Sequence, residues 1–108
     1  MFYYLGFSHK NSTDEEEKVV EISGTKTEKR KVHSIIITAV ENAAYLSAYV
    51  ERDKVIEDFD LDGLNIQNGF EIPLDIMLEE GVTFKIKLKN KVSGTNAAIR
   101  GLIKYEIV

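Results

Sequence analysis

The stretch VTFKIKLK, from Val82 to Lys89, decides the fold class of this chain. Its apolar residues alternate strictly with Thr83 and three lysines. Because successive side chains of a β-strand point to opposite faces of the sheet, this alternation predicts a strand with one buried and one solvated face. The lysines would also discourage pairing with another chain if the strand lay at the edge of its sheet.

The same period continues at the C-terminus. From Ile99 to Ile107, three isoleucines, Gly101 and Tyr105 share one face, and Leu102 joins three charged residues on the other. This segment is therefore predicted as a strand that ties the end of the chain into a sheet.

Upstream, Val32 to Val40 is rich in β-branched residues, which favour strands. It is apolar on both faces, as is typical of a central strand. Ala44 to Val50 alternates again. Residues 41–43 between them are few enough to predict a hairpin.

Four further segments are predicted as strands, and Asp75 to Glu80 is long enough for one helical turn. Pro73 cannot donate a ladder hydrogen bond, so its strand is expected at a sheet edge or to end there. The four strands are Phe2–Phe7, Lys18–Ile22, Val55–Leu61 and Phe70–Leu74. Turn signals separate the predicted strands: Ser23-Gly24, Asp62-Gly63, Asn68-Gly69, Glu80-Gly81 and Ser93-Gly94.

About eight short antiparallel strands in 108 residues predict an all-β protein, a single β-sandwich or jelly-roll-like domain over residues 1–108. In this interpretation residues 31–108 form the main sandwich. Residues 1–30 add N-terminal strands and a mobile polar loop at 8–18. The chain has no cysteine, which excludes disulfides, thiolate zinc sites and cysteine nucleophiles.

The charge pattern narrows the range of partners. The net charge is −4 and no basic stripe is present, so nucleic-acid binding is not expected. No apolar run approaches the roughly 20 residues of a membrane span. Met1 to Gly6 lacks the features of a signal peptide, which predicts synthesis and folding in a cytosol.

A possible calcium site begins at Asp58. Asp58, Asp60, Asp62 and Gly63 match the first half of a calcium-binding loop, in which alternate carboxylates converge on the ion. Gly69 stands where the loop should supply a bidentate glutamate. The alternative is a strand with a wet acidic face. No other cofactor is expected.

His33 is the one histidine inside a predicted strand. Its reference pKa would suit a general base, but no nucleophile is near in sequence, so a packed or hydrogen-bonded side chain is the preferred interpretation. No catalytic motif occurs, and we expect no enzyme.

Two sets of aromatic residues are candidates for binding. Tyr45 and Tyr49 stand on one face of a predicted strand, where they would either stack on a sugar or be covered by another part of the fold. The N-terminal residues contain more large apolar side chains than a small core can bury at a terminus, which predicts a docking or subunit contact. These residues are Phe2, Tyr3, Tyr4, Leu5 and Phe7.

From Lys31 to Val108 the layout resembles small β-sandwich or jelly-roll domains of virions, in particular phage capsid-decorating and accessory proteins. The resemblance rests on the strand from Ser34 to Val40, the turn at Asn42, the segment Leu78 to Phe84 and the turn at 93–96. It implies a non-enzymatic structural protein of a virus or phage particle, located in the virion, that forms homo-oligomers and contacts other particle proteins.

Two alternatives remain open. One is a carbohydrate-binding module that uses Tyr45 and Tyr49. The other is a bacterial β-sandwich interaction domain, which would be cytoplasmic.

Overall fold

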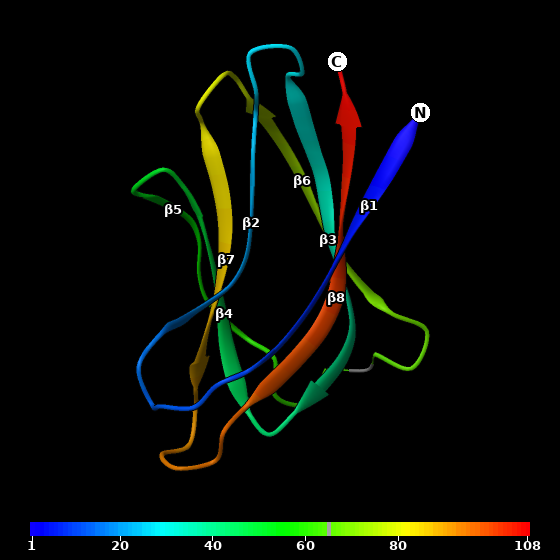
Figure 1. The fold of residues 1–108 in the computed structure, drawn as a ribbon. Coiled ribbons are helices and arrows are strands. Elements are labelled where there is room, and N and C mark those ends of the chain that lie inside the picture. The colour runs from blue at the N-terminus through cyan, green and yellow to red at the C-terminus, as the bar shows by residue number, and fades with distance from the viewer. Residues whose placement is uncertain (65) are drawn as a thin grey trace.

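Two four-stranded sheets lie face to face in the computed structural model, which describes residues 1–64 and 66–108 (Figure 1). All the strand pairs within the two sheets are antiparallel. The all-β sandwich is therefore confirmed. Its strands are β1 (Phe2–Lys10), β2 (Glu17–Ser23), β3 (Arg30–Glu41), β4 (Ala44–Val50), β5 (Asp53–Asp60), β6 (Phe70–Leu78), β7 (Thr83–Asn90) and β8 (Ala98–Ile107).

The strand order is β1-β8-β3-β6 in one sheet, called sheet A here, and β2-β7-β4-β5 in the other, called sheet B. The apolar strand β3 is central, as predicted. The lysine-bearing strand β7 lies between β2 and β4, so its lysines do not guard an edge. No described segment forms a helix long and apolar enough to span a membrane.

The hairpin predicted between β3 and β4 is wrong. The two strands belong to different sheets, so residues 41–43 cross from one layer to the other. Asn42 turns the chain with φ 64°, and its side-chain amide donates to the carbonyl of Thr95 at 2.7 Å. A short connection fits a hairpin and a crossing equally well, and periodicity does not identify the partner of a strand.

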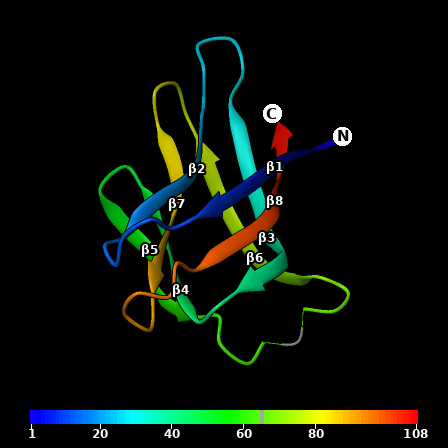
Figure 2. The ribbon, with the colours of Figure 1, turned by 60° about the horizontal axis from the view of Figure 1, so that its bottom comes forward.

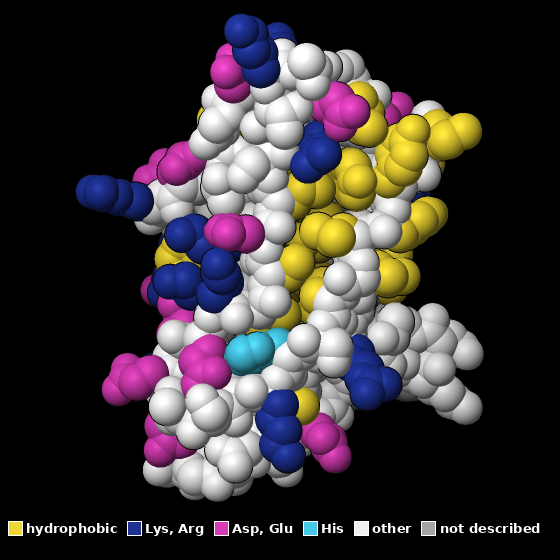
Figure 3. All heavy atoms as spheres, viewed as in Figure 1, with side chains coloured by type: hydrophobic (Ala, Val, Ile, Leu, Met, Phe, Trp, Pro, Cys, Tyr) yellow, Lys and Arg dark blue, Asp and Glu magenta, His cyan; other side chains and the backbone are white. Residues whose placement is uncertain are grey.

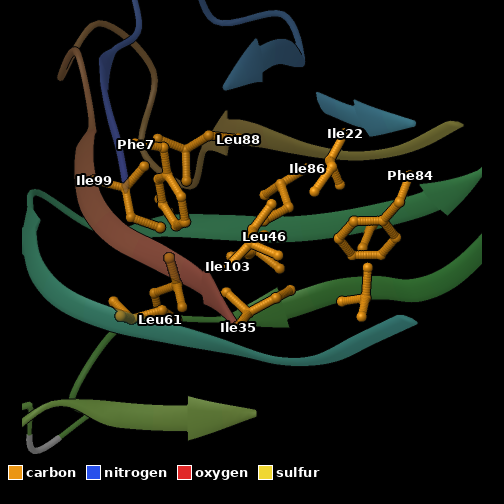
Figure 4. Packing of buried hydrophobic residues seen from close by; sticks show 14 of the residues in the cluster. Phe7, Ile22, Ile35, Leu46, Leu61, Phe84, Ile86, Leu88, Ile99 and Ile103 are labelled. Atoms are coloured by element: carbon orange, nitrogen blue, oxygen red, sulfur yellow. The ribbon is translucent and has the colours of Figure 1, made fainter. Parts of the chain in front are cut away.

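The core is the layer between the two inner faces (Figure 4). Phe84, Ile86 and Leu88 are fully buried, which is the face that the alternation in β7 predicts. From sheet A, Ile35 and Ile103 are also fully buried. Burying each such side chain stabilises the fold by about 1.5–3 kcal/mol.

Strand β6 is longer than predicted. The expected helical turn at 75–80 is wrong, because the strand continues to Leu78 and Met77 pairs with Lys31 of β3. Pro73 does lie in an edge strand, opposite Ser34 and beside a shift in register. A strand edge needs no ladder hydrogen bond from proline, so β6 accommodates it.

The polar loop predicted at 8–18 is also shorter than expected. Ser8 to Lys10 extend β1, and Glu17 and Lys18 begin β2, so the connection comprises residues 11–16. Asn11 is buried at the start of this connection, where its side-chain amide nitrogen donates to the carbonyl of Leu88 at 2.8 Å. Residues 1–30 therefore supply one edge strand to each sheet.

Strands β1 and β8 approach closely at Gly101, which pairs with Phe7. A Cβ atom at this glycine would lie 2.6 Å from Cζ of the Phe7 ring and would clash with the carbonyl oxygen of Ile36. The absence of a side chain at Gly101 is what allows the Phe7 ring to enter the core.

We therefore predict that Gly101→Ala lowers the free energy of unfolding by about 1–3 kcal/mol, the usual cost of overpacking. Chemical denaturation followed by circular dichroism would measure it. Gly6→Ala is the matched control, because its Cβ would meet only Leu102 Cδ2 at 3.7 Å. Equal stability of the two variants would contradict the proposed close approach.

Candidate interaction surface

The N-terminal residues lie in β1, the edge strand of sheet A, beside the C-terminal strand β8. Phe2 is 45%, Tyr3 39% and Tyr4 56% exposed, whereas Leu5 is half-buried. Both chain ends lie at the same end of the sandwich (Figure 2). The predicted apolar surface at the N-terminus is therefore present on the molecule.

The C-terminus enlarges this surface. Six of the nine exposed large apolar side chains of the described residues lie at the ends of β1 and β8. Figure 3 shows apolar side chains gathered over the N-terminal end of β1. This terminal patch consists of Met1, Phe2, Tyr3, Tyr4, Ile107 and Val108.

Phe7 does not belong to the terminal patch, and its assignment to a docking contact is corrected. Only 8% of Phe7 is exposed, and its ring packs in the core. Odd-numbered residues of β1 point to the inner face, and sheet B covers that face at Phe7 but not at Tyr3. The alternation along the strand could have predicted that Phe7 lies on the inner face of β1. It could not have predicted at which residue sheet B stops covering that face.

Aromatic contacts hold the terminal patch in place. The Tyr3 ring stacks on Tyr105 with 5.6 Å between centroids, and the Phe2 ring meets His33 edge-on at 4.9 Å. A hydrogen bond of 3.1 Å joins His33 Nε2 to Glu106 Oε1, which confirms that His33 is hydrogen-bonded. Side chains already fixed in this way lose little conformational entropy on binding a partner.

Tyr45 and Tyr49 lie on the outer face of sheet B, half-buried among lysines. The Lys91 ammonium is 5.9 Å from the centroid of the Tyr45 ring. Those of Lys54 and Lys87 are 5.6 Å and 5.0 Å from the Tyr49 ring. A sugar could stack on these rings only after displacing the ammonium groups, so glycan binding stays a prediction.

The Tyr49 hydroxyl is also engaged, since it donates to Glu16 Oε1 at 2.6 Å. Burial, and then the hydrogen bond to Glu16 and the negative charge of that carboxylate, raise the pKa of Tyr49. This tyrosine therefore contributes to the contact between β4 and the loop before β2.

The three aspartates of the predicted calcium site do not converge. Asp60 and Asp62 both contact the Lys91 ammonium, at 2.8 Å and 3.5 Å. Asp58 turns toward β4, where its backbone amide donates to the Ser47 hydroxyl at 3.0 Å. In residues 1–64 and 66–108, no three acidic or histidine side chains group as metal ligands. Lys91 supplies the positive charge beside Asp60, and its hydrogen bond lowers the pKa of that carboxyl.

Two carboxylates, Asp14 in the loop before β2 and Glu17 at the start of β2, have a role that sequence reasoning missed. Asp14 accepts hydrogen bonds from the Gly94 amide at 2.8 Å, the Asn90 amide group at 2.9 Å and the Ser93 hydroxyl at 2.7 Å. These bonds, that from Gly94 first, lower its pKa to about 2. Asp14 therefore links two loops 76 to 80 residues apart, a distance that local patterns cannot reveal.

Glu17 closes the same loop from its other end. Its carboxylate accepts from the Thr13 hydroxyl and amide, both at 2.8 Å, and from the Ser12 amide at 3.0 Å. The Thr13 hydroxyl makes the largest contribution to lowering the pKa of Glu17 to about 2. Asp14 and Glu17 thus brace a connection that was predicted to be a mobile polar loop.

Two shallow hollows of about 280 and 300 Å³ lie side by side at the opposite end, where both are lined by Val40. Glu41 and Arg100 are the charged residues lining one, and Asp62 lines the other. These side chains do not form a nucleophile–base arrangement, so the terminal patch remains the best-supported site.

The fold is similar to one solved structure, described as the nucleoplasmin-like N-terminal domain of Drosophila FKBP39. The two chains are 15% identical, the TM-score is 0.51, and the match covers 100% of this chain and 89% of that one. No protein-family model and no curated protein matches the chain. At this identity the likeness shows the fold alone, a nucleoplasmin-like β-sandwich, and not the virion resemblance expected from the strand layout.

The loop carboxylates predict how stability depends on pH. Both have a pKa of about 2 in the folded state, against 3.8 for Asp14 and 4.5 for Glu17 in their ordinary state. Their contribution is therefore complete above about pH 5 and is lost as the pH falls toward 2. Thermal melts at pH 7, 5, 3 and 2 should show Tm falling across this window.

The double variant Asp14→Asn, Glu17→Gln should melt lower than the native chain at pH 7 and lose less on acidification. Asp53→Asn with Glu57→Gln, two exposed acids of β5, is the matched control. If the Tm of the double variant fell as steeply with pH as that of the native chain, the brace would be refuted.

Proposed function

We propose that this chain is a non-enzymatic protein-interaction domain that self-associates through its terminal patch. The supporting observation is the concentration of exposed apolar side chains at the paired ends of β1 and β8. Contiguous apolar surfaces on small soluble domains mark protein contacts. By associating with a second copy, a small domain also buries apolar surface that its own core cannot cover.

The character of the side chains supports this function. Phe2, Tyr3 and Tyr4 are aromatic anchors of the kind that contribute most of the energy at interfaces. Lys104 lies with its ammonium 4.4 Å from the centroid of the Phe2 ring and adds a charged rim. Apolar anchors surrounded by polar groups are the usual arrangement of a binding surface.

The finer roles remain proposals. Capsid decoration in a virus or phage particle rests on the strand layout alone. The likeness to a nucleoplasmin-like domain adds an architecture and identifies no partner. Glycan binding at Tyr45 and Tyr49, calcium binding at Asp58, Asp60 and Asp62, and a location in a virion or in the cytoplasm also stay predictions.

Sedimentation velocity over a concentration series would test self-association. We expect the native chain to form oligomers, and Tyr4→Lys to weaken them by about tenfold or more, as for loss of an interface anchor. Val55→Lys is the matched control, because Val55 is 45% exposed on β5, away from the patch. A native chain that stays monomeric throughout would refute the proposed function.

A further inference from the structure

The free edge of β1 presents unpaired backbone groups beside the terminal patch. The backbone amide of Asn11, one residue beyond β1, donates to the carbonyl of Ala97 at 2.8 Å. Strand β1 pairs with β8 without a shift in register. In an antiparallel pair, hydrogen-bonded residues alternate with residues whose backbone groups point away. The backbone groups of the odd-numbered residues of β1 therefore bond to β8. The backbone groups of Phe2, Tyr4, Gly6 and Ser8 point to the free edge.

This edge lacks the protection that the other three edges carry. Proteins block sheet edges with charges, prolines and bulges. Edge strand β6 contains Pro73 and two acids, β5 contains four acids, and β2 contains charges and a register shift at Val19. By contrast, β1 has no charged residue from Phe2 to Ser8.

Space is available beside this edge. β1 meets β2 near its C-terminal end, where His9 Nε2 lies 3.1 Å from Glu17 Oε1. Toward its N-terminus β1 diverges from β2 (Figure 1). Leu5, on the inner face of β1, stays partly exposed although it packs against the core. A strand added to β1 would bury more of this side chain.

We propose that β1 pairs antiparallel with β1 of a second copy, so that the two A sheets join into one eight-stranded sheet across a two-fold axis. This inference rests on the proposed self-association and specifies its geometry. The axis passes at Leu5, which places Tyr4 opposite Gly6 and Phe2 opposite Ser8 of the other copy. The even-numbered residues then bond to each other through their free backbone groups.

A second copy suits this edge better than an unrelated strand. In the proposed register the outer-face rings of Phe2 and Tyr4 each face a small residue, and an aromatic ring laid across a glycine is a stabilising cross-strand pair. Lys10 falls beyond the paired segment, so the two copies bring no like charges together. The inner-face residues Tyr3 and Leu5 extend the apolar layer across the axis.

Backbone amide exchange measured by NMR on the native chain tests the geometry. At concentrations where the oligomer forms, we expect the amides of Tyr4, Gly6 and Ser8 to become protected, and to lose protection on dilution. The amides of Leu5 and Phe7 should be protected in both states, because they bond to β8. Oligomers whose even-numbered amides exchange freely would refute the strand pairing and leave the proposed function standing.

Gly6→Pro gives an independent measurement. Proline removes a donor at the free edge without breaking a hydrogen bond to β8, so the dissociation constant should rise about tenfold, as for two lost bonds per dimer. Gly6→Ala keeps the backbone donor at the same position and should therefore associate more tightly than Gly6→Pro. Unchanged association of a folded Gly6→Pro variant would overturn the pairing, and a native chain that never associates would refute the proposed function itself.

Discussion

The apolar contact between the two inner faces is the interaction on which the rest of this structure depends. Each sheet alone would expose one apolar face, and stacking the two sheets removes both apolar faces from water. Phe84 and Ile86 from sheet B and Ile35 from sheet A are fully buried in this layer. Strict alternation along the strands follows from this constraint, because every second side chain must face the layer.

The candidate site exists because this contact ends before the strands do. At Phe7 the inner face of β1 is covered by the core, and four residues earlier Tyr3 is 39% exposed on the same face. The partly exposed Tyr105 stacks on it from β8. Side chains that the sandwich pattern orients inward are thus left without a covering sheet, and an apolar surface forms without any break in the sequence period.

Local periodicity predicted the strands well and their partners badly. The strand at Val82–Lys89 and the central strand at Val32–Val40 follow from side-chain spacing alone. The crossing at Asn42 does not, because the choice of sheet depends on contacts far away in the sequence. The N-terminal surface was predictable from composition. The convergence of Asp60 and Asp62 on Lys91 was not, since that lysine lies 29 or more residues away.

The distribution of charge along the sheet edges is the strongest reason to regard β1 as a contact strand. Charged residues make up 30% of the chain, so they are available for any exposed position. Three edge strands carry them, and β1 carries none across the residues that lie free of β2. An uncharged edge with exposed aromatic rings is a liability for a domain that stays alone. It is the expected composition for an edge that is covered by another strand.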